Sequence, residues 1–176
     1  MSDHMRTALV TGASSGFGKL ICIALARQGY RVVATMRDLQ RRDELIREAE
    51  AAGVASRIDP FRVDVTDGRT IAEAVDYANA RYGGIGVLVN NAGFAVGGFV
   101  EEVPEEGWRA QMETHFFGVV AMTRAVLPGM RERRDGTIVM IGSLSGRLAF
   151  PGYGAYAASK FALEGFGESL RHEMSP

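Results

Sequence analysis

Tyr156 and Lys160 are the two residues of this chain whose types and spacing most directly suggest chemistry. They lie four positions apart in a segment predicted to be a helix, so one turn brings the phenol and the ammonium group onto one face. A nearby cation favours the phenolate form of a tyrosine, which makes Tyr156 a candidate general acid or base. Ser143 follows the apolar run 138–141, a predicted strand, and its hydroxyl is expected to face the same helix. Because tyrosine and lysine also occur together on solvated helix faces, the rest of the chain must decide between these interpretations.

Composition places limits on the kind of protein. The chain has 176 residues, of which 23% are charged, and a formal net charge of -1. That length suits one domain, and the charge gives no reason to expect a nucleic acid or membrane partner. The single cysteine, Cys22, excludes an intramolecular disulfide and is compatible with a cytoplasmic location. We interpret residues 1–5 as an expression remnant and residues 6–176 as a single domain.

A strand, a glycine turn and a helix are predicted at the beginning of this domain. The apolar run 7–10 leads into TGASSGFG at 11–18, and apolar residues then recur at helical spacing up to Gly29. Glycines permit close backbone approach, and the amides at a helix start bind phosphate. The spacing differs from G-x-G-x-x-G, but its placement favours phosphate binding over a purely structural turn. The expected cofactor-binding residues of the turn are Gly12, Ser14, Ser15, Gly16, Phe17 and Gly18.

The end of the predicted second strand, 31–36, bears on the choice of cofactor. In dinucleotide-binding folds an acid at this point binds the ribose 2′-hydroxyl, whereas an arginine accommodates a 2′-phosphate. Arg37 follows the strand, with Arg41 and Arg42 close by, so we favour NADP. NAD stays open because Asp38 lies about twenty residues beyond the glycine turn, where an acid is expected.

Two further strand-like segments, 59–65 and 85–90, flank a helical pattern at 66–82. Continuous apolar strands that alternate with helices predict an α/β fold with a doubly wound parallel sheet. Ligands of such sheets bind beyond the carboxyl ends of the strands. The residues expected at that edge are Gly12, Asp64, Asn91 and Ser143.

Five features, in this order and spacing, resemble the short-chain dehydrogenase/reductase family: TGASSGFG at 11–18, DV at 64–65, NNAG at 90–93, Ser143, and YAASK at 156–160. The resemblance implies a nicotinamide cofactor and hydride transfer to or from a carbonyl or alcohol carbon of a small molecule. It implies that Tyr156 exchanges the proton of the substrate oxygen, that Ser143 donates to that oxygen, and that Lys160 favours the phenolate and holds the nicotinamide ribose. It also assigns adenine contacts to Asp64 and Val65, and inner-ribose contacts to Asn91, Ala92 and Gly93. No metal site is predicted.

His115 departs from the family pattern. The long helix predicted at 105–127, between Pro104 and Pro128, aligns HFFG with the family's Asn-x-x-Gly, whose asparagine helps to hold a water in the proton path to the lysine. Three interpretations stay open: a functional substitute that holds a water or relays a proton because histidine titrates near neutrality, a damaged relay, or an inert packed residue. His115 is therefore included among the candidate catalytic residues.

The C-terminal end is the second departure, because family members continue beyond the tyrosine–lysine helix into a substrate-binding segment. We therefore expect the chain to be a fragment whose 138–141 strand is an unprotected edge. The resemblance also implies a homo-oligomer, either a dimer or a tetramer. Besides an oxidoreductase, a catalytically weak dinucleotide-binding module and an interaction domain with a vestigial fold stay open.

Overall fold

The computed structural model describes residues 6–174, and the interpretation of residues 1–5 as an expression remnant lies outside them. The strands are β1 (Thr7–Val10), β2 (Arg31–Met36), β3 (Ile58–Arg62), β4 (Val87–Asn90) and β5 (Thr137–Met140). The α-helices are α1 (Gly16–Arg27), α2 (Asp43–Ala51), α3 (Gly68–Tyr82), α4 (Glu105–Met112), α5 (Gly118–Arg133) and α6 (Gly154–Met174). Short 3₁₀ turns are η1 (Leu39–Arg42), η2 (Ala55–Arg57) and η4 (Leu144–Gly146), and η3 (Glu113–Phe117) is a π-helical turn.

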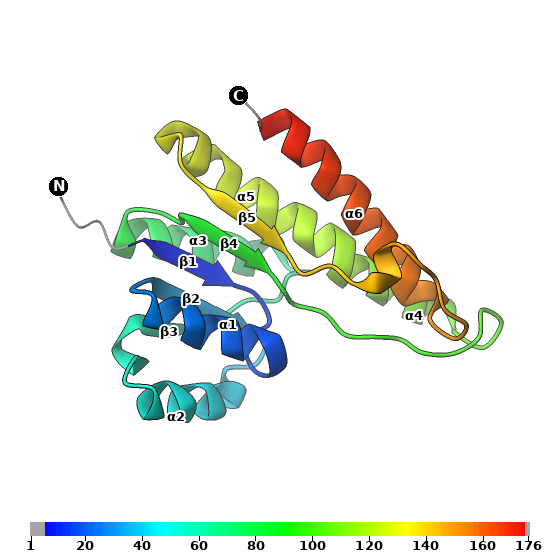
Figure 1. Ribbon diagram of the computed structural model, residues 1–176, viewed down its shortest axis with the longest axis horizontal. Coiled ribbons are helices and arrows are strands. Elements are labelled where there is room, and N and C mark those ends of the chain that lie inside the picture. The colour runs from blue at the N-terminus through cyan, green and yellow to red at the C-terminus, as the bar shows by residue number, and fades with distance from the viewer. Residues whose placement is uncertain (1–5, 175–176) are drawn as a thin grey trace. The chain divides into compact units, whose positions relative to one another are not determined.

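The strands form one parallel sheet in the order β3-β2-β1-β4-β5 (Figure 1). Thr7 of β1 pairs with Arg31 of β2, and Ala8 pairs with Val87 of β4 on the other side. The order therefore reverses between β1 and β4, which is where doubly wound sheets bind their ligands. This arrangement confirms the predicted α/β, Rossmann-like fold.

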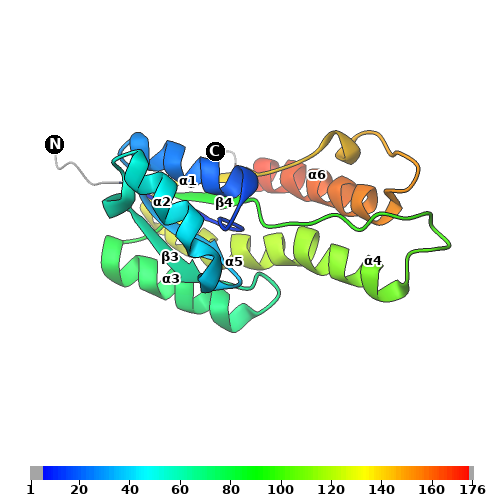
Figure 2. The same ribbon diagram turned by 90° about the horizontal axis from the view of Figure 1, so that it is seen from below.

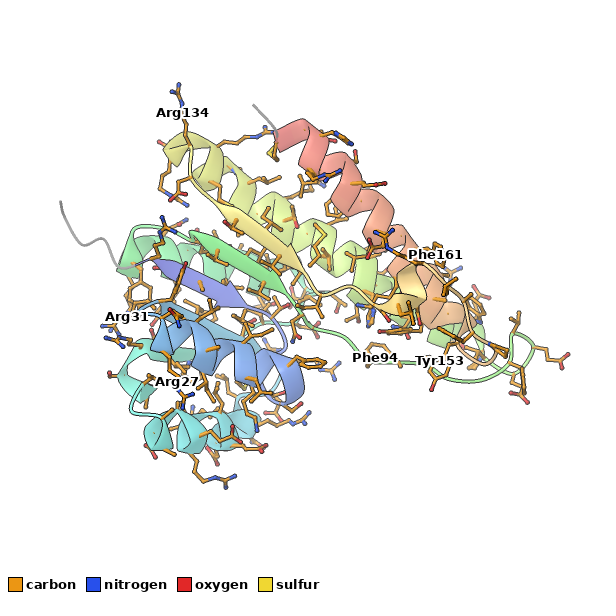
Figure 3. The ribbon with its side chains drawn as sticks, viewed as in Figure 1. Arg27, Arg31, Phe94, Arg134, Tyr153 and Phe161 are labelled. Carbon is orange, nitrogen blue, oxygen red and sulfur yellow. The ribbon has the colours of Figure 1, made fainter. Side chains whose placement is uncertain are left out.

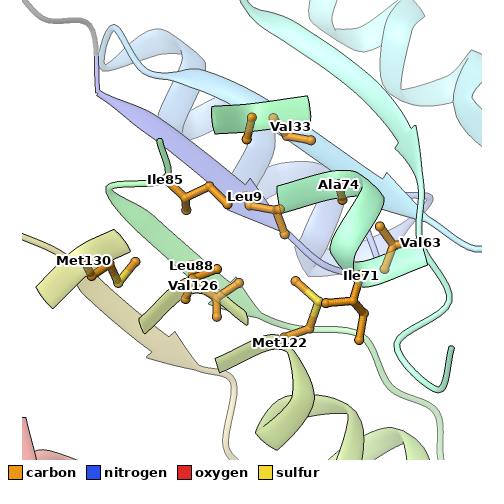
Figure 4. Packing of buried hydrophobic residues seen from close by; sticks show 11 residues of the cluster. Leu9, Val33, Val63, Ile71, Ala74, Ile85, Leu88, Met122, Val126 and Met130 are labelled. Carbon is orange, nitrogen blue, oxygen red and sulfur yellow. The ribbon is translucent and has the colours of Figure 1, made fainter. Parts of the chain in front are cut away.

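The chain divides into two compact units, which we describe separately. The first contains residues 6–92 and 121–139, and its helix α1 lies on the opposite face of the sheet from α3 (Figure 2). Between α3, the 121–133 part of α5 and the sheet lies an apolar core (Figure 4). Its central side chains, Leu9, Leu88 and Met122, have no exposed surface. Continuous apolar strands produce this burial because helices cover the sheet.

The second unit contains the described residues 93–120 and 140–174. Helices α4 and α6 pack against each other, and η4 packs on α6. Two irregular segments, 93–104 and 147–153, are joined by a parallel bridge between Gly98 and Tyr153 and by a hydrogen bond from the Gly98 N–H to the Gly152 carbonyl (2.9 Å). These contacts fix both segments beside the start of α6.

The predicted end of the long helix at Pro128 is wrong, since α5 continues through Pro128 to Arg133. A proline inside a helix costs about 3 kcal/mol because it removes one hydrogen bond and crowds the preceding turn. Val126 and Met130, on either side of it, are both buried in the core. We attribute the continuation of the helix to this packing. The same long helix also contains the π turn, which the sequence pattern did not predict.

Candidate active site

In the first unit, hydrogen bonds of Thr11 and Asn91 stabilise the glycine turn after β1. The Thr11 hydroxyl oxygen accepts hydrogen bonds from the N–H groups of Asn91 and Ala92, both at 2.9 Å. The Asn91 side-chain amide donates to the carbonyls of Thr11 (2.9 Å) and Gly12 (3.2 Å). These bonds fix the glycine turn to the end of β4, so the predicted residues of the two segments come together.

The glycines of this turn are required by space and by conformation. A Cβ at Gly18 would lie 2.2 Å from the Gly12 carbonyl oxygen, and one at Gly12 would lie 2.7 Å from the Ala92 Cα. Gly12 and Gly16 have φ values of 70° and 55°, which favour glycine. The three predicted glycines are thus each explained by the turn.

The start of α1 suits an anion. Ser15 is its N-cap residue but makes no side-chain cap hydrogen bond, and the first turn carries no acidic residue. Amides at a helix start that are not capped by a side chain can bind a phosphate. Ser14 is partly buried, whereas Ser15 and Phe17 are exposed at the surface. The turn therefore fits the pyrophosphate of a dinucleotide.

Arg37 and Asp64 follow neighbouring strands, β2 and β3, and interact electrostatically. Partial burial alone would raise the pKa of Asp64, but hydrogen bonds from the Thr66 N–H (3.0 Å) and hydroxyl (2.8 Å), together with the charges of Arg37 and Arg62, lower it. Arg37 is exposed, and Val65 is half-buried beside Asp64. The Asp38 carboxylate accepts from the Gln40 N–H (2.9 Å) and so caps η1. Capping of η1 therefore accounts for the presence of an acid at position 38.

In the second unit, η4 holds the Ser143 segment against α6. A Cβ at Gly142 would lie 2.8 Å from Glu164 Oε1, and one at Gly146 would lie 3.1 Å from the Lys160 carbonyl oxygen. The absence of side chains at these glycines lets the segment approach the helix closely. Ser143 is half-buried, and its Oγ accepts from the Ser145 N–H (3.1 Å), which leaves its own O–H available to donate.

Tyr156 and Lys160 lie one turn apart on α6, as predicted. The Lys160 Nζ is 5.7 Å from the centroid of the Tyr156 ring and donates to the Ile141 carbonyl at 2.7 Å. Lys160 is only 8% exposed, and this burial lowers its pKa, while Glu164 offsets part of the shift. An ammonium group has three donors, so two remain for other partners. This buried, anchored lysine is unlike a lysine on a solvated helix face.

His115 lies in the π turn and contacts both the 93–96 segment and Tyr156. Its Nε2 accepts from the Phe94 N–H (2.9 Å), and its ring is 5.5 Å from that of Tyr156 in an edge-to-face arrangement. A Cβ at Gly93 would lie 2.6 Å from the same nitrogen, which explains the glycine there. π turns inside α-helices occur frequently at functional sites.

The expectation that His115 titrates near neutrality is wrong. Burial lowers its pKa to about 4, and the charge of Lys160 adds to the shift, against a smaller opposite effect of the Phe94 N–H. The imidazole is therefore neutral at pH 7. Because Nε2 accepts a hydrogen bond, we assign the ring proton to Nδ1, which is buried and has no hydrogen-bond partner among residues 6–174.

Gln111 was not among the predicted residues, yet it fixes the same segment. It is completely buried; its Oε1 accepts from the Val96 N–H (2.8 Å) and its Nε2 donates to the Phe94 carbonyl (2.9 Å). The signal in the sequence is its position four residues before His115, on the same long helix. Its partners are backbone groups, and a sequence motif carries no information about contacts with the backbone.

The fold and these two clusters define a class: a Rossmann-like chain with a dinucleotide-type glycine turn in one unit and a tyrosine–lysine helix in the other. Comparison with known families agrees, since the short chain dehydrogenase family matches residues 6–176. The chain belongs to the short-chain dehydrogenase/reductase family.

Two curated relatives are similar over nearly the whole chain. An uncharacterized oxidoreductase, YusZ, of Bacillus subtilis is 45% identical over 173 residues, which cover 98% of this chain and 61% of the relative. A 3-ketodihydrosphingosine reductase of Bacteroides thetaiotaomicron is 42% identical over 168 residues, covering 96% and 58%. The chain thus spans about three fifths of the length of these relatives.

Solved structures agree with the fold. A short-chain dehydrogenase from Streptomyces avermitilis has a TM-score of 0.89 at 43% identity, covering 99% of this chain and 62% of that one. A variant of the actinorhodin polyketide ketoreductase with NADPH has a TM-score of 0.91 at 37% identity, covering 97% and 65%. An enzyme of the family from Burkholderia phymatum, in complex with NAD, has a TM-score of 0.89 at 30% identity, covering 96% and 60%. Similar structures therefore bind either nicotinamide dinucleotide.

Within residues 6–174 there is no helix long and apolar enough to cross a membrane. The same residues contain no group of three or more histidine, cysteine, aspartate or glutamate side chains that could hold a metal ion.

Proposed function

We propose that this chain is an oxidoreductase that interconverts a carbonyl compound and a secondary alcohol with NADP(H). The observation that carries the proposal is the second unit's cluster, in which a buried Lys160 is anchored beside Tyr156 and the Ser143 segment is held on the same helix. Membership of the family supports the reaction class.

The first unit supports the cofactor part of the proposal. The turn that includes Gly12, Gly16 and Gly18 would hold the pyrophosphate. Asp64 and Val65 would contact the adenine, and the inner ribose would be lined by Asn91, Ala92 and Gly93. Arg37 is exposed at the end of β2 and would bind a 2′-phosphate, whereas Asp38 is engaged in capping η1. These features favour NADP over NAD. When bound, the nicotinamide accepts or supplies the hydride.

The remaining steps belong to Tyr156, Ser143 and Lys160. The Tyr156 hydroxyl donates a proton to the substrate oxygen during reduction and takes it back during oxidation. The free O–H of Ser143 donates to the same oxygen and stabilises its developing negative charge. The buried ammonium of Lys160 is held 5.7 Å from the centroid of the Tyr156 ring, and its two remaining donors are available to the cofactor ribose.

His115 would act as a positioning residue. Because burial keeps its ring neutral at pH 7, we assign it no protonation step of its own. It instead anchors the Phe94 N–H and presents a fixed Nδ1–H, which can hold a water beside Lys160. This favours the functional-substitute interpretation over a damaged relay.

The test is a cofactor titration followed by turnover. We expect saturable fluorescence changes with NADPH and weaker binding of NADH. In Arg37→Ala the two cofactors should bind with equal affinity. Tyr156→Phe should bind NADPH normally but reduce ketone-dependent NADPH oxidation by about 100-fold or more. Cofactor binding without turnover on any ketone would favour the alternative, a catalytically weak dinucleotide-binding module. Equal turnover in Tyr156→Phe would contradict the assigned acid and base.

A further inference from the structure

Exposed apolar side chains lie on the two irregular segments of the second unit, which are joined beside the start of α6, the helix that carries Tyr156. Four of them form what we call the apolar rim: Phe94, Val100, Phe150 and Tyr153, with exposed fractions of 43%, 72%, 46% and 48%. Side chains of this size are usually buried, and contiguous exposed apolar surface marks binding sites. Figure 3 marks Phe94 and Tyr153, one on each of the two irregular segments of this unit.

Measured contacts connect the rim to Tyr156. The Tyr153 ring lies 6.5 Å from the Tyr156 ring, and the Phe94 ring lies 5.9 Å from that of His115, which in turn contacts Tyr156. The Tyr153 N–H donates to the Phe150 carbonyl (3.2 Å). Val100 lies beside Gly154, the first residue of α6. The rim therefore reaches Tyr156 directly through Tyr153 and indirectly through Phe94 and His115.

The rim offers no charge to a ligand. Segments 93–100 and 148–154 contain no Asp, Glu, Lys, Arg or His. The charges that flank the first segment are the acidic Glu101 and Glu102, both exposed. Arg147, which flanks the second segment, lies 3.7 Å from the carboxylate of Glu164. His115 is neutral and Lys160 is buried. An anionic group on the rim would find no counter-ion within the two segments and would face the acidic Glu101 and Glu102 next to the first of them.

We propose that the substrate is a neutral carbonyl compound or alcohol with a bulky hydrocarbon portion, which lies on the apolar rim while its oxygen meets Tyr156. This inference rests on the proposed function. Burying each additional methylene against apolar surface should strengthen binding by about two- to fourfold.

Trp108 provides a direct readout of this surface. It is the single tryptophan of the chain, it is half-buried, and a Cβ at Gly154 would lie 3.1 Å from its ring and 3.5 Å from Val100 Cγ2. Its fluorescence should therefore respond to a ligand on the rim, without cofactor or turnover.

The experiment titrates the 176-residue chain with 2-octanone, 2-butanone and the anionic 7-oxooctanoate, following Trp108 fluorescence. We expect 2-octanone to bind at least about tenfold more tightly than either of the others. Phe150→Ser and Val100→Ser should each weaken 2-octanone binding by about threefold or more. Phe161→Ser is the matched control, because Phe161 is 47% exposed on α6 outside the rim (Figure 3) and should leave binding unchanged.

Each result has a distinct meaning. Three results would overturn the rim proposal: no saturable fluorescence change with 2-octanone, equal affinity for the three ligands, or an equal loss of 2-octanone affinity in Phe150→Ser and Phe161→Ser. Tight, rim-dependent binding without ketone reduction would uphold the rim and reject the proposed function. Reduction of 2-butanone and 7-oxooctanoate as efficiently as 2-octanone would uphold the function and reject the rim.

Discussion

His115 occupies the place at which the family resemblance implies an asparagine. The surroundings of His115 determine what this replacement of asparagine by histidine does. Its Nε2 is committed to the Phe94 N–H, and its ring is 3% exposed beside Lys160. Both burial and the neighbouring cation oppose protonation. A histidine so placed resembles an asparagine more than a proton carrier, because both offer a neutral acceptor and a neutral donor.

This placement predicts a loss of stability in mild acid. The unfolded chain takes up a proton on His115 below about pH 6.5, whereas the folded chain does so only near pH 4, so the free energy of unfolding falls as pH decreases between these values. Between pH 7.5 and pH 5.0 we expect a contribution of about 2 kcal/mol. Urea unfolding followed by Trp108 fluorescence measures it, because His115→Asn should lose that much less stability over the same range.

The wild type and His115→Asn have the same carboxylates, so the difference between their pH dependences removes the contribution of carboxylate titration to stability. Parallel pH dependences would contradict a buried neutral imidazole. The same variant, assayed at pH 7, should turn over at an unchanged or higher rate. A large fall would rule out a damaged relay and would instead make the imidazole itself necessary.

At the scale of elements, one long helix sets the path of the 93–96 segment. Gln111 in α4 and His115 in the π turn bind it through three hydrogen bonds, between 2.8 and 2.9 Å long. Because Gly93, Phe94 and Ala95 are exposed, we expect these bonds to determine how rigidly Phe94 is held.

Gln111→Ala tests this dependence. Removing the amide leaves the Val96 N–H and the Phe94 carbonyl without their partner, which should lower the free energy of unfolding by about 1–3 kcal/mol. Amide hydrogen exchange by NMR should become faster at Val96 than in the wild type. Gln40→Ala is the matched control, because Gln40 is exposed and its side chain has no such role. Unchanged protection at Val96 would show that the segment is held by something else.

The elements that the sequence predicts well are those whose burial leaves a continuous apolar pattern. Local composition dictates the strands expected at 31–36 and 85–90 and the glycine turn, and the structure has them within a few residues of these bounds. The expected helix end at Pro128 is wrong because tertiary packing of Val126 and Met130 overrides a local helix breaker. The same limit applies to function: the charge state of His115 depends on burial, and the role of Gln111 depends on backbone groups fifteen or more residues away.

At the scale of the whole molecule, the two edges of the sheet differ in chemistry. Edge strand β3 carries Asp59, Pro60 and Arg62, all of which discourage pairing with another strand. Edge strand β5 reads TIVM, and its Val139 is 37% exposed. Within the described residues, β5 is therefore the unguarded edge of the sheet. A homo-oligomer stays a proposal, and this edge is where we expect self-association of the chain to begin.

Val139→Lys should suppress that association. A lysine on an edge strand adds charge and removes exposed apolar surface, so sedimentation velocity across a concentration series should show a shift toward monomer. Leu20→Lys, at a 55% exposed position on α1, makes the same chemical change away from the edge and should leave the distribution as in the wild type. A wild-type chain that is a monodisperse monomer at high concentration, or equal effects of the two lysines, would show that β5 does not drive association. In that event the exposed apolar residues of the second unit would become the next surface to test, because they remain open to a partner as well as to a substrate.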